Sequence, residues 1–181
     1  RAAGDPRAGG SSSGPAEGMM GGALQIPAHA FGKMTLFMCA GAIYVATGKK
    51  AISEMRGLGR RMPWVFGAFL VGSLSIIGIP PMVGGWPKVL LMLGAADSGD
   101  SYVAWVLVIS SLLNIAYLLP IAVLGLMPPR GTPEPAPYKR PEGAPPFAVA
   151  APVFTAIGTV VLFFLMGEIY DFLLPAIGGQ S

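Results

Sequence analysis

The chain has 181 residues, of which 53% are hydrophobic and only 12% are charged, and its formal net charge is +3. A soluble domain usually carries about 25% charged residues, and here the charges fall in blocks between long uncharged stretches. This composition excludes an ordinary soluble domain and indicates an all-α integral membrane protein. Because the net charge is small and most Lys and Arg lie in loops, it does not indicate a nucleic-acid partner.

The chain begins with a stretch that cannot bury a core. Residues 1–18 are small and polar and include proline, so we expect them to be disordered or foreign to the fold. An apolar segment follows, with a first membrane span expected at roughly 28–48, after Pro27. The loop at 49–61 is basic, since it holds five Lys or Arg residues and one Glu.

The next apolar block, residues 62–96, is interrupted by the sequence GIPPMVGGWP. A bilayer core of about 30 Å needs about 20 helical residues, so this block is too long for one span. No continuous helix tolerates such a density of glycine and proline. We therefore expect residues 62–79 to cross the membrane and residues 82–96 to return, with an irregular piece near Gly78–Lys88.

Two further spans complete the expected set of about five transmembrane helices, all within a membrane domain over 19–181. An acidic link at 97–101 precedes a span at 102–127. A proline-rich connector at 128–146 is expected to be extended and solvated, and it leads to the last span at 147–174.

Three ionisable residues lie inside these apolar segments: His29, Lys33 and Lys88. His29 and Lys33 are spaced i, i+4 and share a helix face, while Lys88 follows the interruption and lies near mid-membrane. An ionisable group in the bilayer costs about 3 kcal/mol or more, so it is a functional candidate. Desolvation disfavours a charged ammonium and an imidazole titrates near neutrality, so groups of this kind joined by water can relay protons.

Structural explanations for the same residues stay open. Lys33 can snorkel to the interface, His29 can be a hydrogen-bonded residue near a helix start, and Lys88 can face water at a re-entrant turn. Three other polar residues, Gln25, Ser110 and Asn114, are further candidates for a pathway or for hydrogen bonds between helices. Such residues, like the neighbouring Ser111, more often serve helix packing.

Motifs of enzymes are absent from the sequence. His29 is the only histidine, there is no CxxC pair, and no glycine-rich loop ends in GK[ST]. We therefore expect no catalytic residues of its own, no cofactor and no bound metal.

The stretches HAFGKMTLFMCAGAIYVATGKK, SEMRGLGRRMPW and SLSIIGIPPMVGGWPK together resemble the antiporter-like membrane subunits. This family is shared by complex I, the proton-pumping NADH:quinone oxidoreductase, and by the multi-subunit Mrp-type Na+/H+ antiporters. The amino-acid sequence of the first stretch is most similar to the D subunit of the Mrp assembly. The resemblance covers roughly residues 17–127 and implies a C-terminal fragment of a subunit with about fourteen helices.

The resemblance also implies roles for particular residues. The H-A-x-x-K motif of the family falls on His29 and Lys33, which would belong to a central hydrophilic axis. Lys88 matches the lysine assigned to proton transfer in the second half-channel. The chain departs from the family pattern at Gln25, where another histidine is common, and at Trp86-Pro87, where Phe-Ser is usual.

The sequence thus predicts a proton-translocating subunit of a multi-subunit monovalent cation/proton antiporter in the bacterial cell membrane. Its partners would be other membrane subunits, the lipid bilayer, protons and Na+. Two alternatives stay open: an antiporter-like subunit of complex I, and a non-transporting scaffold left by truncation. The membrane orientation also stays open, because the basic loop favours a cytoplasmic position whereas the resemblance implies the outer face.

Overall fold

The structure is a computed structural model, and it describes residues 13–48, 51–127 and 145–178. These residues form five α-helices and two short 3-10 helices, in the order α1 (Ser13–Thr47), η1 (Ile52–Met55), η2 (Leu58–Arg60), α2 (Pro63–Ile77), α3 (Gly85–Asp97), α4 (Ser101–Leu126) and α5 (Pro146–Gly178). The expected all-α membrane fold is confirmed. Over the described part of the chain, three helical segments are long and apolar enough to cross a bilayer: Ala16–Thr47, Ser101–Leu126 and Pro146–Ile177.

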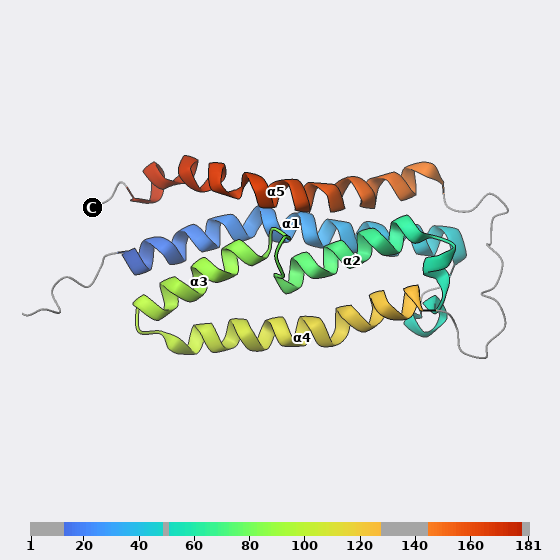
Figure 1. The fold of residues 1–181 in the computed structure, drawn as a ribbon, viewed down its shortest axis with the longest axis horizontal. Coiled ribbons are helices and arrows are strands. Elements are labelled where there is room, and N and C mark those ends of the chain that lie inside the picture. Colours follow the sequence, from blue (N-terminus) through green and yellow to red (C-terminus); the bar gives the residue numbers. More distant parts are fainter. Residues whose placement is uncertain (1–12, 49–50, 128–144, 179–181) are drawn as a thin grey trace, which may run out of the picture.

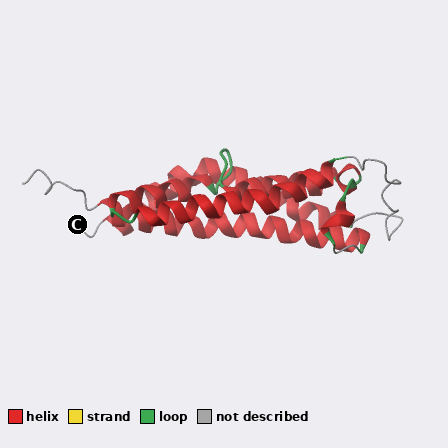
Figure 2. Cartoon of the chain, turned by 90° about the horizontal axis from the view of Figure 1, so that it is seen from below, coloured by secondary structure: helices red, strands yellow, loops and turns green. Residues whose placement is uncertain are grey.

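The helices form an elongated bundle in which α1, α4 and α5 run nearly the full length (Figure 1). The shorter helices α2 and α3 follow one another along α1, each covering about one half of it. The connection between them is a loop at mid-length, visible in the view from below (Figure 2). Two half-length helices therefore occupy the place of one full-length helix.

Contacts with α1 fix the direction of this pair. Three of them are spread along the bundle: Cys39 Sγ lies 3.3 Å from the Val65 oxygen, a Cβ at Gly32 would lie 3.1 Å from Ile76, and one at Gly21 would lie 2.9 Å from the Leu91 nitrogen. From Cys39 to Gly21, toward the N-terminus of α1, the residue numbers of the contacting residues rise from 65 to 91. Residues 63–97 thus run antiparallel to α1 throughout, without a reversal.

The structure differs here from the expected crossing at 62–79 and return at 82–96. Glycine and proline stop the helical hydrogen bonding, but the chain resumes in the direction it already had. The described chain passes along the bundle four times, so that α4 ends and α5 begins at the end that carries η1 and η2 (Figure 1). Residues 13–18, expected to lie outside the fold, form the first turns of α1, whereas residues 1–12 and 128–144 lie outside the described residues.

Buried apolar side chains gather in two clusters, one on either side of the break. The cluster at the η1–η2 end is built from α1, α2, α4 and α5 with the η2 turn, and its members include Ile43, Leu58, Phe66 and Ala122. The cluster at the other end joins α1 and α5 to the break and includes Leu24, Val83 and Met166. Between the clusters lies a level of the bundle that carries polar groups.

Candidate functional site

Two glycines allow α2 to stop and α3 to start within a few residues. Gly78 follows the last residue of α2 with a φ of 92°, and its N–H donates to the Leu74 oxygen at 2.9 Å. A side chain is rarely tolerated at such a positive φ. At Gly84 a Cβ would lie 1.8 Å from the Ser75 oxygen, so the start of α3 packs directly on the backbone of α2. The break is therefore compact and leaves the end of α2 within reach of α3.

Lys88 crosses this break with its side chain. Its ammonium donates to the Ile76 and Ile77 oxygens, both at 2.7 Å, and to the Ser111 hydroxyl at 3.0 Å. An ammonium has three protons and no acceptor, so these three bonds use its whole capacity. The two carbonyls also belong to the C-terminal turn of α2, where the helix dipole favours a positive charge. The Lys88 ammonium is thus held by three neutral oxygen atoms, two on α2 and one on α4.

The depth of Lys88 follows from its place in α3. It lies nine residues before Asp97, the end of the helix, which corresponds to about 14 Å of helix. Half of a bilayer core of about 30 Å is about 15 Å, so a bilayer with its edge at Asp97 would have Lys88 near its middle. The side chain is only partly buried, in agreement with a site reached from more than one helix.

On α1 the polar residues Gln25, His29 and Lys33 follow one another over about 12 Å of helix, alongside the break between α2 and α3. Residues four apart on a helix are rotated by about 40° relative to one another, so this row turns gradually around α1. Gln25 and His29 are partly buried between helices, whereas Lys33 is exposed on the outer side. Gly32, the neighbour of Lys33 on α1, packs on Ile76, whose carbonyl oxygen accepts a hydrogen bond from the Lys88 ammonium. The structure therefore brings the three predicted ionisable residues into one neighbourhood.

Ser75 adds a polar group that the sequence did not single out. It is only 2% exposed, and a Cβ at Gly32 on α1 would lie 3.5 Å from its hydroxyl oxygen. Among the described residues, the Ser75 hydroxyl and the Gln25 amide oxygen are buried without a hydrogen-bond partner. Other buried hydroxyls at this level, those of Thr35, Ser73 and Thr159, donate to carbonyls of their own helices. Within the part of the chain that the structure describes, these two groups therefore stand out as buried polar atoms without any hydrogen-bond partner.

On α4 the residue that bonds to Lys88 is Ser111, and not Ser110 or Asn114, the two candidates named from the sequence. Ser110 is exposed, and the Asn114 side-chain oxygen accepts a hydrogen bond from the Tyr117 hydroxyl on the same helix. Neighbouring residues on a helix point about 100° apart, so Ser110 and Ser111 cannot both reach Lys88. The sequence shows that hydroxyls are present on α4, but only the packing shows which one faces α3.

The unusual Trp86-Pro87 pair fits the local geometry. Because α3 begins at Gly85, Pro87 lies in the first helical turn, where its missing N–H would have no helical partner in any case. Trp86 is an exposed side chain that lines a cavity of about 380 Å³ beside the break, together with Pro80, Val89 and Phe163. Lys88 is thus presented to α2 and α4 despite the departure from the family pattern.

The donor set of this site is made of amine, imidazole, hydroxyl, amide and carbonyl groups. Within residues 13–48, 51–127 and 145–178, no group of three or more His, Cys, Asp or Glu side chains is placed to hold a metal ion. The groups that are present can hold a proton, donate it and accept it. The chemistry that the arrangement supports is therefore proton exchange between side chains at mid-membrane.

Comparison with known proteins gives matches over most of the chain. Residues 10–114 match the model of a family described as NADH:quinone oxidoreductase/Mrp antiporter, transmembrane. Subunit N of the NADH-quinone oxidoreductase of Desulforudis audaxviator is 33% identical over 147 residues, which cover 80% of this chain and 29% of the relative. Subunit L of the corresponding enzyme of Rickettsia bellii is 34% identical over 103 residues, covering 57% of this chain and 16% of the relative.

A solved structure also matches the fold. A chain of respiratory complex I from Thermus thermophilus with bound aureothin superposes with a TM-score of 0.61 at 28% identity. The match covers 86% of this chain and 35% of that chain. The present chain thus spans about a third or less of the length of the proteins that it matches.

Proposed function

Because the chain belongs to the NADH:quinone oxidoreductase/Mrp antiporter transmembrane family, we propose that it forms part of a proton-translocating membrane subunit. In this proposal Lys88, His29 and Lys33 transfer protons at mid-membrane, and Gln25 and Ser75 complete the polar path between helices. The observation that carries the proposal is the position of the Lys88 ammonium, held by two carbonyls and a hydroxyl at the break between α2 and α3.

The hydrogen bonds of Lys88 give a physical link between its proton and the shape of the break. The charged ammonium satisfies three acceptors, but a neutral amine has only two N–H groups and one lone pair. When Lys88 loses a proton, one of its three acceptors must therefore find another donor. Both carbonyls belong to the last turn of α2, so a change of protonation alters the forces that hold α2 against α3.

His29 is the next group along the proposed path. Its imidazole is partly buried, and it lies on α1 one helical turn before Lys33. A neutral imidazole donates from one nitrogen and accepts at the other, so it can take a proton from one side and release it to the other. Lys33, which is exposed on α1, would continue the path toward parts of the protein beyond this chain.

The relatives support the complex I-type alternative better than the Mrp-type subunit favoured from the sequence. Subunits N and L of NADH-quinone oxidoreductases are both among the matches. In this form of the proposal, the partners are other membrane subunits of a redox-driven assembly, and the oxidation of NADH takes place elsewhere in it. Exchange of Na+ belongs to the Mrp-type form, and the two forms predict different responses to added Na+.

The test uses the full-length protein with its partner subunits in sealed vesicles, where proton uptake is followed after addition of NADH. We expect Lys88→Leu to lower the rate of proton uptake at least tenfold. We also expect Lys88→Arg to lower it, because arginine keeps the positive charge at the break but does not release its proton. Ser110→Ala, a substitution on the exposed face of α4, serves as the matched control and should leave the rate unchanged.

The outcomes separate the competing functions. Proton uptake that depends on added Na+ and not on NADH would favour the Mrp-type subunit. If Lys88→Leu and Lys88→Arg both support uptake at the parental rate, the path proposed through this site is wrong. The alternative of a non-transporting scaffold would then be the better explanation.

A further inference from the structure

The Ser75 hydroxyl and the Gln25 side-chain oxygen lie beside the break, and neither has a hydrogen-bond partner among the described residues. Ser75 is 2% exposed, and a Cβ at Gly32 on α1 would lie 3.5 Å from its hydroxyl oxygen. A buried polar group without any partner is unfavourable, and buried water commonly satisfies such groups. Both atoms therefore have hydrogen-bonding capacity for a further molecule.

Gln25 and Gly32 lie on the same side of α1. They are seven residues apart, which is about two turns or 10 Å of helix, and their directions differ by only about 20°. Gly32 packs on Ser75 of α2, and Gly21, one turn before Gln25, packs on Leu91 of α3. Gln25 therefore lies on α1 between the contact with α2 and the contact with α3, alongside the break.

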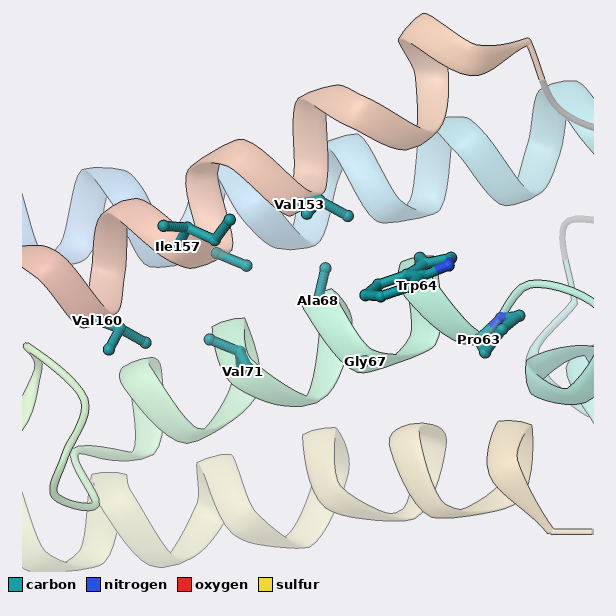
Figure 3. Close-up of a pocket in the computed structure, with 9 residues that line it drawn as sticks. Pro63, Trp64, Gly67, Ala68, Val71, Val153, Ile157 and Val160 are labelled. Carbon is teal, nitrogen blue, oxygen red and sulfur yellow. The ribbon is translucent and has the colours of Figure 1, made fainter.

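The surroundings of Ser75 restrict what can bind to it. Its side chain is enclosed where α1 and α2 pack together, so neither a lipid chain nor another protein segment can reach the hydroxyl while these helices stay packed. The cavity between α2 and α5 has an apolar lining that ends at Val71 and Val160, and Ser75 lies one turn beyond Val71 (Figure 3). A water molecule is small enough for such a place, and about two to four polar partners suffice to hold it.

Ser75 also links the hold on Lys88 to the polar part of α1. It directly precedes Ile76, whose carbonyl oxygen accepts a hydrogen bond from the Lys88 ammonium at 2.7 Å. On α1, His29 lies three residues before Gly32, which packs on both Ser75 and Ile76. A molecule bound to the Ser75 hydroxyl would therefore lie beside the residue that holds Lys88 and beside the segment that carries His29.

From these features we propose that Ser75 is a positioning residue of the proton path. Its hydroxyl and the Gln25 oxygen bind water between α1 and the break, and this water carries protons between Lys88 and His29. In one transfer, the Lys88 ammonium gives a proton to the water, and the water gives one of its protons to the His29 imidazole. Lys88 becomes neutral, His29 becomes positively charged, and the water is unchanged. This inference rests on the proposed function of Lys88 and His29.

The first test compares two serines of α2 in vesicles of the full-length protein with its partner subunits. Ser73→Ala is the matched control, because Ser73 is also buried but its hydroxyl donates to the Phe69 oxygen at 2.8 Å. We expect Ser75→Ala to lower the rate of proton uptake about fivefold or more, and Ser73→Ala to leave it unchanged. The free energy of unfolding should fall more in Ser73→Ala, because only that variant loses a hydrogen bond within the protein. A merely structural role of the two serines would give the same order in both measurements.

The second test detects water at Ser75 without measuring transport. In Ser75→Cys, the S–H stretching band of the new thiol is followed by infrared spectroscopy after transfer from water to heavy water, and the spectrum of the parent is subtracted. A thiol exchanges its proton for a deuteron only when water reaches it. We expect fast exchange in Ser75→Cys and slow exchange in Ser73→Cys.

Two results would overturn the inference: proton uptake at the parental rate in Ser75→Ala, or exchange in Ser75→Cys as slow as in Ser73→Cys. Lys88→Leu in the same vesicles shows which proposal has failed. If Lys88→Leu still lowers uptake, the proposed function stands and only the role of Ser75 is wrong. If Lys88→Leu also supports uptake at the parental rate, the proposed function fails and the role of Ser75 fails with it.

Discussion

The Nζ atom of Lys88 on α3 lies 2.7 Å from the carbonyl oxygen of Ile77, the last residue of α2. A single side chain therefore joins the two halves of an interrupted helix near mid-membrane. The contact does two things at once, because it satisfies carbonyls that the helix leaves free at its end and it gives the ammonium acceptors in an apolar medium. The stability of the break and the charge of Lys88 are thus tied together.

Gly78→Ala is expected to disturb both the stability of the break and the hydrogen bonding of the Lys88 ammonium. The φ of 92° at Gly78 costs a non-glycine residue about 1–3 kcal/mol, and a Cβ there would lie 3.0 Å from the Lys88 Cδ. We expect a lower free energy of unfolding and a lower rate of proton uptake in vesicles of the full-length protein.

The control for this prediction is Gly99→Ala. Gly99 has a φ of 80°, but a Cβ there would meet nothing within 4 Å. It should lower the free energy of unfolding by a similar amount while leaving proton uptake unchanged. Equal loss of uptake in the two variants would mean that Gly78 acts through backbone strain alone and not through Lys88.

Ser111→Ala is expected to weaken the hold on Lys88 without removing its charge. A hydrogen bond to a charged group contributes about 1.5–3 kcal/mol, so the loss should be visible in the free energy of unfolding. Proton uptake by the reconstituted protein should also slow. Ser110→Ala should change the free energy by no more than about 0.5 kcal/mol, because Ser110 is exposed. A larger loss of unfolding free energy in Ser110→Ala than in Ser111→Ala would contradict the finding that Ser111, and not Ser110, faces Lys88.

Gly125→Ala is expected to disrupt the packing of α4 on α2. A Cβ at Gly125 would lie 1.8 Å from the Phe66 ring, and Phe66 is only 1% exposed, so the ring has no free space to move into. Overpacking of this kind costs about 1–3 kcal/mol, measurable as reduced thermal stability of the purified protein. Gly67→Ala on α2 meets nothing within 4 Å and should be neutral or stabilising by up to about 1 kcal/mol.

The charges at the two ends of the bundle predict its orientation. Arg56 and Arg60 are exposed at the end that carries η1 and η2, whereas Asp97 and Asp100 are exposed at the opposite end. By the positive-inside rule, we expect the end with η1 and η2 to face the cytoplasm. Four passes also place the start of α5 at that end.

This prediction is checked by labelling with a membrane-impermeant maleimide in cells. Arg60→Cys should be labelled only after the membrane is permeabilised, and Ser98→Cys should be labelled in intact cells. Labelling of both after permeabilisation is the control for accessibility. Labelling of Arg60→Cys in intact cells, with Ser98→Cys protected, would establish the opposite orientation.

Much of the fold could be predicted from composition, because uncharged stretches and glycine–proline clusters mark where membrane helices begin and end. The break near Gly78 is an example. The direction of the chain after the break could not be predicted in this way. Glycine and proline end a run of hydrogen bonds, but they carry no information about whether the following helix turns back, and here the packing of Gly21 on α3 shows that it continues.

The ionisable residues of the site were also predictable, since His29, Lys33 and Lys88 are conspicuous in apolar segments. Their partners were not. A transmembrane helix such as α4 is apolar on every side, so no hydrophobic stripe indicates which of its faces meets the bundle. For this reason Ser111 could not be preferred over Ser110, and Ser75, an ordinary serine in an apolar run, gave no signal before its burial was known.

The two apolar clusters on either side of the polar level have an electrical consequence. Material of low polarisability sustains most of a voltage applied across it, so a membrane potential would fall mainly over the two clusters and little over the polar level between them. A charge at Lys88 would then lie about halfway through the field. Moving one charge across the whole membrane changes its electrical free energy by about 2.3 kcal/mol per 100 mV. A proton that leaves Lys88 toward either side would pass through about half of that, or about 1.2 kcal/mol per 100 mV. The break thereby divides one large electrical step into two smaller ones of similar size.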